Sequence, residues 1–198
     1  VKRLGAQNYV GNEEYAAGVG GGEYYAAHGS KNVLCVNTLP GATNTEARCK
    51  GVADGLAKSS GKSSQLPLPS SSFGNPTAVA QAIKAALQKD KTIDGVITIS
   101  AGDANSAATG ISQAGVVKQV KLAAFDMDST NLQRIKEGTQ LFCIDQQPYL
   151  QGFLSVAMLN GFVQYGLKVA TSPILTGPGI VDASNVAATL AGAAAGAR

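Results

Sequence analysis

The sequence predicts an α/β fold built on a parallel, doubly wound sheet, and two observations support this. Short apolar runs that read as strands alternate with longer runs of helical character along most of the 198 residues. That alternation favours a parallel sheet covered by helices on both faces. Each apolar run also leads into polar side chains, as at the carboxyl edge of such a sheet. The length suffices for one sizeable core, or for one domain with part of another.

The first half of the chain alternates helices with strands. Tyr9 and Val10 end an extended piece, and Asn12 can cap a helix over residues 13–28 that Gly29 can terminate. Next come a strand "NVLCVN" over 32–37, a helix over 44–58, a flexible segment over 58–64, a weak strand over 65–68 that Pro67 favours at an edge, and a helix over 77–88 after Asn75 and Pro76. In that last helix the apolar positions 79, 83, 86 and 87 form one face at helical spacing.

The second half continues the same alternation. Its predicted elements are a strand over 94–100, a helix over 103–115, a strand over 120–125, a short helix over 132–136 with Ser129 as its cap, a strand over 140–144, a helix over Pro148–Tyr165, and a low-complexity tail over 187–198 that we expect to be a fraying helix. No charged residue stands between Gln146 and Leu167, so the helix in this segment has little polar surface for a free surface helix. Its polar side chains and internal glycines argue against a membrane span.

Polar residues follow the predicted strands at 37–44, 72–75, 100–103, 126–128 and 145–147. Because the carboxyl ends of parallel strands meet at one edge, we expect these groups to form one rim, where such sheets bind ligands. Several of them, namely Asn44, Asn75, Asp103 and Ser129, also stand where a helix cap belongs. Arg48 is not needed for capping and is unfavourable beside the positive end of its helix, which makes it the better candidate for a ligand contact. Carboxylates, amides and an arginine suit a ligand rich in hydroxyl groups.

Other classes of function find little support. The net charge is +3, and the 16 basic residues are scattered, so no nucleic-acid surface is indicated. The single histidine, His28, stands at a helix end, so a serine or cysteine nucleophile lacks the usual base. "SSGKSS" fails the phosphate-loop pattern because its first glycine position is Leu56, and "GVGGGE" fails the dinucleotide pattern at Glu23. We therefore predict neither an enzyme nor a cofactor.

The three cysteines have no metal-ligand spacing. If the helix over 44–58 packs back on its own strand, Cys35 and Cys49 come together. A disulfide and two buried thiols are both compatible with this. A bond would close a loop of about 15 residues, worth roughly 3 kcal/mol in the chain-entropy model, and would imply an oxidising compartment. We predict the bond, with Cys143 free.

At these residues the sequence resembles the periplasmic sugar-binding proteins of ABC transporters, of the ribose- and galactose-binding type. An ordered set of segments along nearly the whole chain carries the resemblance: "YVGNEEYAAG", "PGATNTEARCKG", "SSSFGNP", "DGVITISAGDANSAATGISQAG", "LAAFDMD" and "FCIDQQPYLQG". The resemblance implies a lobe of the type I periplasmic-binding-protein fold and no catalytic residues.

The resemblance also implies a ligand set. Asn44 and Arg48 would hold a sugar, Phe73 would supply an aromatic wall, Asp126 would accept sugar hydroxyls, and Gln146 would be the ligand at the hinge. In the segment "DGVITISAGDANSAATGISQAG", the family has a ligand-binding asparagine after the strand. The corresponding residue here is Ser100 or, with a gap in the alignment, Asp103.

The family has two lobes, and the resemblance implies that this chain lacks the first. Residues 1–9 would then enter through the hinge, 10–145 would form the second lobe, 146–168 would cross the hinge into a helix of the absent lobe, and 169–198 would return and form the tail. No signal peptide is expected in this chain, but the resemblance implies that the protein is located in the periplasm or otherwise outside the cytoplasm. The expected partners are a sugar or polyol, a membrane permease, and either a first-lobe fragment or a second copy at residues 148–165. The alternative is the effector-binding domain of a lactose-repressor-type regulator, which shares the fold.

Overall fold

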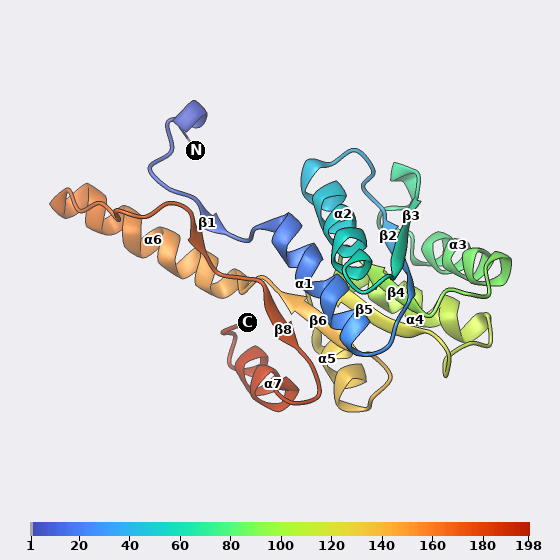
Figure 1. Cartoon of the computed structure of the whole chain (residues 1–198). Coiled ribbons are helices and arrows are strands. Elements are labelled where there is room, and N and C mark those ends of the chain that lie inside the picture. Colours follow the sequence, from blue (N-terminus) through green and yellow to red (C-terminus); the bar gives the residue numbers. More distant parts are fainter. Residues whose placement is uncertain (1) are drawn as a thin grey trace.

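A computed structural model describes residues 2–198 of the chain (Figure 1). Its elements are, in chain order, η1 (Lys2–Leu4), β1 (Val10–Gly11), α1 (Glu14–Ala27), β2 (Asn32–Asn37), α2 (Thr43–Ala57), β3 (Lys62–Pro67), η2 (Ser70–Ser72), α3 (Pro76–Lys89), β4 (Gly95–Thr98), α4 (Ala101–Gln113), β5 (Lys121–Phe125), α5 (Ser129–Lys136), β6 (Phe142–Asp145), α6 (Pro148–Tyr165), β7 (Ile174–Leu175), β8 (Gly179–Val181) and α7 (Val186–Ala194).

The main sheet has the strand order β3-β2-β4-β5-β6-β8. Every neighbouring pair is parallel except β6 and β8, which are antiparallel. The prediction of an α/β fold on a doubly wound parallel sheet is confirmed. The edge position of β3 is also confirmed, because it pairs with β2 at the end of the strand order, but β3 begins at Lys62, inside the segment 58–64 that was predicted to be flexible. The antiparallel β8 was not foreseen.

Helices cover both faces of the sheet, as the alternation of buried side chains along β2 requires. Cys35 faces a core formed with α1 and α2, and Val36 faces a second core formed with α3 and α4. A third cluster joins α5 and the start of α7 to β5, β6 and β8. Figure 1 shows the resulting three layers, with α7 below β8. The tail is therefore tied to the sheet by Val186 and Thr189, which are buried.

Glycines bring α1 and α2 unusually close. A Cβ atom on Gly18 would lie 2.2 Å from the backbone oxygen of Arg48, and one on Gly22 would lie 2.3 Å from that of Val52. The matching glycines Gly51 and Gly55 on α2 face the backbone of α1 in the same way. The run "GVGGGE" thus packs α1 closely against α2, a role that we did not predict from the sequence. The spacing of four residues between the two glycines of each helix is the pattern that could have predicted this close packing.

The predicted helix caps need correction at four places. Glu13 caps α1 in place of Asn12, and Ala42 precedes α2, so Asn44 lies within that helix. The remaining caps are Ser100 for α4 and Asp128 for α5, which accept backbone N–H groups from Asp103 and Asn131 and leave Asp103 and Ser129 inside their helices. Asn75 is the cap of α3 as predicted. Three of the errors arise because neighbouring polar residues can each cap a helix, while α2 begins after Ala42, which makes no side-chain cap hydrogen bond.

The predicted disulfide links β2 to the helix that follows it. Cys35 and Cys49 are bonded in the structure, with their Cα atoms 5.6 Å apart, and Cys143 is a buried free thiol. The bond fixes α2, and with it Arg48, against the sheet.

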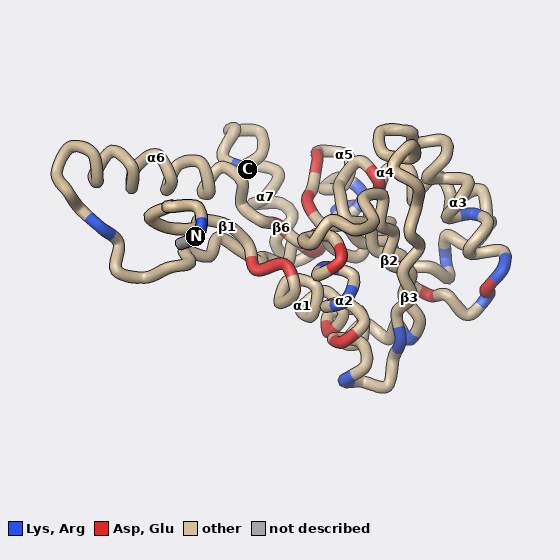
Figure 2. The backbone as a smooth tube through the Cα atoms, turned by 90° about the horizontal axis from the view of Figure 1, so that it is seen from above, with Lys and Arg blue, Asp and Glu red and all other residues tan. Residues whose placement is uncertain are grey.

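One part of the chain projects from this three-layer body. The N-terminal segment, α6 and the short parallel pair β1–β7 lie together at the left of Figure 1, away from the main sheet. The helix α6 has no buried residue among those that the structure describes. Figure 2 shows no coloured charge along it, while Phe153, Val156 and Val163 are more than half exposed. Within the described residues, no helix combines the length and apolar character needed to cross a membrane.

Candidate ligand site

Arg48 lies buried at the carboxyl edge of the sheet. Its Nε donates to Oε2 of Glu14 at 2.6 Å, and its Nη2 donates to Oε1 of the same carboxylate at 3.2 Å. Its Nη1 donates to the backbone oxygen of Ile99 at 2.8 Å and lies 3.9 Å from Oδ2 of Asp126. The guanidinium carbon stands 4.8 Å from the centre of the Phe125 ring. The side chain is thus fixed in plane and direction, with its free edge beside Asp126.

Asp126 and Gln146 occupy the ends of β5 and β6. Gln146 Nε2 donates to Oδ1 of Asp126. The backbone of Asp126 has a φ of 63°, a left-handed conformation that aspartate tolerates better than most residues. The structure therefore brings Arg48, Asp126 and Gln146, which were predicted from sequence, into one connected group.

Burial raises the pKa of Asp126 above its usual range, and the nearby charges of Glu14 and Asp145 act in the same direction. The hydrogen bond from Gln146 and the charge of Arg48 oppose this. A carboxylate that its surroundings do not fully satisfy is a good acceptor for a hydroxyl group, because a ligand supplies the donors it lacks. Strained or underpaired groups of this kind gather at functional sites.

Ser100 and Asp103 lie next to this group and bind each other. Asp103 Oδ2 accepts a hydrogen bond of 2.8 Å from Ser100 Oγ and another of 2.8 Å from Thr38 Oγ1. Asp103 is buried, and Ile99, which contacts Arg48, directly precedes Ser100. These two predicted residues form a hydrogen-bonded support at the end of β4, beside Arg48.

Asn44 and Phe73 are exposed at the ends of α2 and η2. The exposed fraction of Phe73 is 59%, which is high for a large aromatic side chain. Neither residue makes a side-chain hydrogen bond or an aromatic contact with the parts of the chain that the structure describes. The structure does not join them to the group around Arg48, and their ligand roles stay predictions.

Two further residues of the rim were not predicted from the sequence. Glu14, which binds Arg48, was not singled out, and Thr38, which binds Asp103, was included only in the rim segment 37–44. An acid at one helix start and an arginine at the next form a weak signal, because only the close packing of α1 on α2 places them together.

Three chain segments meet beside this rim. Thr176 donates its backbone N–H to the oxygen of Gly11 at 2.9 Å and its Oγ1 to the oxygen of Gln146 at 2.7 Å. Behind them the buried Asp145 accepts a hydrogen bond of 2.8 Å from Arg198. The junction between the three-layer body and the projecting part of the chain therefore lies directly beside Asp126 and Gln146.

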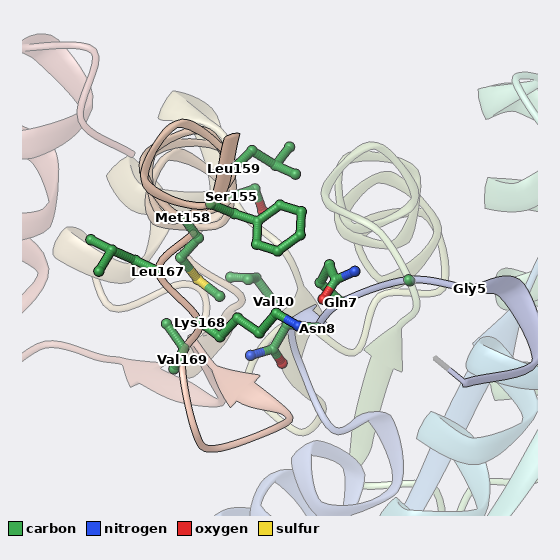
Figure 3. Close-up of a pocket in the computed structure, with 12 residues that line it drawn as sticks. Gly5, Gln7, Asn8, Val10, Ser155, Met158, Leu159, Leu167, Lys168 and Val169 are labelled. Carbon is green, nitrogen blue, oxygen red and sulfur yellow. The ribbon is translucent and has the colours of Figure 1, made fainter. Parts of the chain in front are cut away.

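A separate cavity of about 420 Å³ lies within the projecting part (Figure 3). Gly5, Gln7 and Asn8 line one side, and Ser155, Met158 and Leu159 of α6 line the other. Its walls are mostly apolar and carry no acid, unlike the rim. Among residues 2–198, no group of three or more His, Cys, Asp or Glu side chains is placed to hold a metal ion.

The comparisons with known proteins agree with this architecture. The family described as the periplasmic binding protein domain matches residues 4–167. That is most of the chain, and this chain belongs to that family. No curated protein matches it.

Solved structures give the same fold. A carbohydrate transporter protein from Acidothermus cellulolyticus, in complex with myo-inositol, is 34% identical with a TM-score of 0.89; the match covers 100% of this chain and 66% of that one. A periplasmic solute-binding protein from Actinobacillus succinogenes with bound D-allose is 21% identical, with a TM-score of 0.80 and coverage of 94% and 65%. A carbohydrate transporter solute-binding protein from Agrobacterium radiobacter, in complex with D-arabinose, is 20% identical, with a TM-score of 0.78 and coverage of 93% and 64%. This chain thus spans about two thirds of the length of these proteins.

Proposed function

We propose that this chain is part of a solute-binding protein that captures a sugar or polyol for an ABC transporter by closure of two lobes. The observation that carries the proposal is the connected group of Arg48, Asp126 and Gln146 at the carboxyl edge of the sheet. A guanidinium donates, a carboxylate accepts, and an amide does both, so together they match hydroxyl groups, which donate and accept. The ligands named for the similar proteins are polyols and sugars.

The proposal assigns residues 10–145 to one lobe, 146–168 to a crossing and a helix of a partner lobe, and 169–198 to the return segment and tail. Two observations support this division. The three segments joined by Gly11, Gln146 and Thr176 run side by side where two lobes would connect. Beyond them, α6 and the cavity in Figure 3 present apolar surface that a folded partner lobe would cover. Closure of such lobes about a hinge is a common way to enclose a small ligand.

The disulfide between Cys35 and Cys49 supports an extracytoplasmic home, since such bonds persist in oxidising compartments. A permease would then be the macromolecular partner, and the role would be binding without catalysis. The regulator alternative is not favoured, because the similar structures described above are transport proteins.

Calorimetry of a protein that carries both lobes tests the proposal, with myo-inositol, D-allose and D-arabinose as probes. Arg48→Ala and Asp126→Ala should each weaken the best-bound probe by about 2 kcal/mol, roughly thirtyfold, because a buried charged partner loses its mate. Lys50→Ala is the matched control, since Lys50 is an exposed residue of α2 paired with Asp54, and it should bind normally. Unchanged affinity in both site variants would refute the site.

A further inference from the structure

Arg48 keeps unused donors although it is buried. Of the five N–H groups of a guanidinium, three are used within the described chain: two by Glu14 and one by Ile99. The two that remain are one on Nη1 and one on Nη2. Each terminal nitrogen of Arg48 therefore keeps one unused donor.

A second acid, Asp126, lies near these terminal nitrogens without a hydrogen bond to them. Oδ2 of Asp126 lies 3.9 Å from Nη1 of Arg48, about an ångström longer than a charge-assisted hydrogen bond. Opposite charges in a half-buried setting attract strongly at this distance. Something must therefore hold Arg48 back from Asp126.

Glu14 is placed to do so. It binds Nε and Nη2 together, which fixes one edge of the guanidinium, while the backbone oxygen of Ile99 holds Nη1. Glu14 is itself held by Nδ2 of Asn12 at 3.4 Å and stands in the first turn of α1, where a negative charge is favourable. The contact of Gly18 with the backbone of Arg48 brings the two helices within reach of each other.

We propose that Glu14 is a positioning residue that holds Arg48 away from Asp126, so that the guanidinium and the carboxylate both stay open to ligand hydroxyls. Without it, Arg48 would close the gap and pair with Asp126, and a ligand would have to break that ion pair before binding. This inference rests on the proposed function for the identity of the ligand, but not for the geometry.

The titration of Asp126 reports the position of Arg48 without any sugar. The charged groups that face Asp126 are Arg48 from α2, Glu14 from α1 and Asp145 from β6, and Gln146 is hydrogen-bonded to it. Nuclear magnetic resonance of the aspartate carboxyl carbons in the 198-residue chain follows this group directly. Thermal stability is a poorer readout, because loss of any buried ion pair lowers it.

In Glu14→Gln the titration midpoint of Asp126 should fall, for two reasons. A negative charge is removed, and Arg48 moves closer. Making Glu14→Gln in an Arg48→Gln background measures the effect of the lost charge alone. In that background the titration midpoint of Asp126 should fall less than it does when Arg48 is present. Glu23→Gln is the matched control, since Glu23 lies on the same helix and pairs with Lys58 at 2.6 Å; it should leave the midpoint unchanged.

An equal fall with and without Arg48, or no fall at all, would overturn the proposal. If Glu14→Gln does not fold, Glu14→Asp keeps the charge on a shorter side chain that cannot hold both nitrogens. It should lower the midpoint too, and an unchanged midpoint there contradicts the proposal. Because no sugar is present, failure of the proposed function leaves this result intact.

Discussion

At the scale of the residue, the charged carboxylate of Asp126 should lower the stability of the folded protein. Burial raises its pKa in the folded state, so the folded protein binds more protons than the unfolded chain between the ordinary pKa and the raised one. Stability therefore falls as the pH rises through that window, and the loss persists at neutral pH. Asp126→Asn removes the charge and keeps an acceptor for Gln146, so it should raise the melting temperature at pH 7 and have little effect well below the ordinary pKa of aspartate.

Asp182 provides a control of the opposite sign. Hydrogen bonds from Ser184 and Tyr24 lower its pKa, so its contribution to stability is present above the ordinary pKa and is lost on acidification through the lowered one. Asp182→Asn should therefore lower the melting temperature at pH 7. Calorimetric scans of both variants from acid to neutral pH check the pair. A fall for Asp126→Asn matching that for Asp182→Asn would show that Asp126 is a structural residue.

At the scale of the element, the contact between α1 and α2 should depend on Gly18. In Gly18→Ala the new methyl would lie 2.2 Å from the backbone oxygen of Arg48, so the helices must separate. We expect a loss of about 1–3 kcal/mol, as for overpacking in a core. Gly20→Ala is the matched control on the same helix, because its methyl meets open space and should stabilise α1 by up to about 1 kcal/mol. Urea unfolding compares them, and equal stabilities would contradict the packing account.

The disulfide acts at the same scale, because it ties the middle of α2 to β2. Alkylation without reductant, followed by mass spectrometry of the unfolded chain, should label one thiol, that of Cys143. Reduction should cost about 3 kcal/mol in the chain-entropy model. Three labelled thiols would remove the bond and its support for an extracytoplasmic home.

Most helices and strands and part of the candidate site could be predicted from the sequence, for different physical reasons. Strands such as Asn32–Asn37 and the helix Pro148–Tyr165 have the predicted bounds, because apolar runs and proline mark them locally. Asp126 and Gln146 follow from the rule that polar residues after parallel strands share an edge, and Arg48 follows from its unfavourable place near the positive end of its helix. Glu14 does not follow, because its role depends on a tertiary contact between glycines. Nor does β8, whose three residues carry too short a pattern to be distinguished from a loop.

At the scale of the whole molecule, the exposed face of α6 should make the isolated chain associate. Val156 and Val163 are 68% and 78% exposed on a helix without charge, and apolar patches of this kind mark interaction surfaces. Light scattering should show concentration-dependent association, and the double change Val156→Lys with Val163→Lys should reduce it. Ala85→Lys on the solvent side of α3 is the control. A monodisperse monomer at all concentrations would contradict the assignment of α6 to a partner lobe.

The most direct test of the central claim is a titration of the isolated 198-residue chain with myo-inositol, followed by nuclear magnetic resonance. If this chain supplies one wall of a two-walled site, losing even four hydrogen bonds of roughly 1 kcal/mol each weakens binding about a thousandfold. We expect weak binding, with the signals of Arg48, Asp126 and Gln146 shifting together. Micromolar affinity would show that the chain is a complete binding module, and shifts confined to the cavity between Gln7 and Met158 would show that the ligand binds elsewhere.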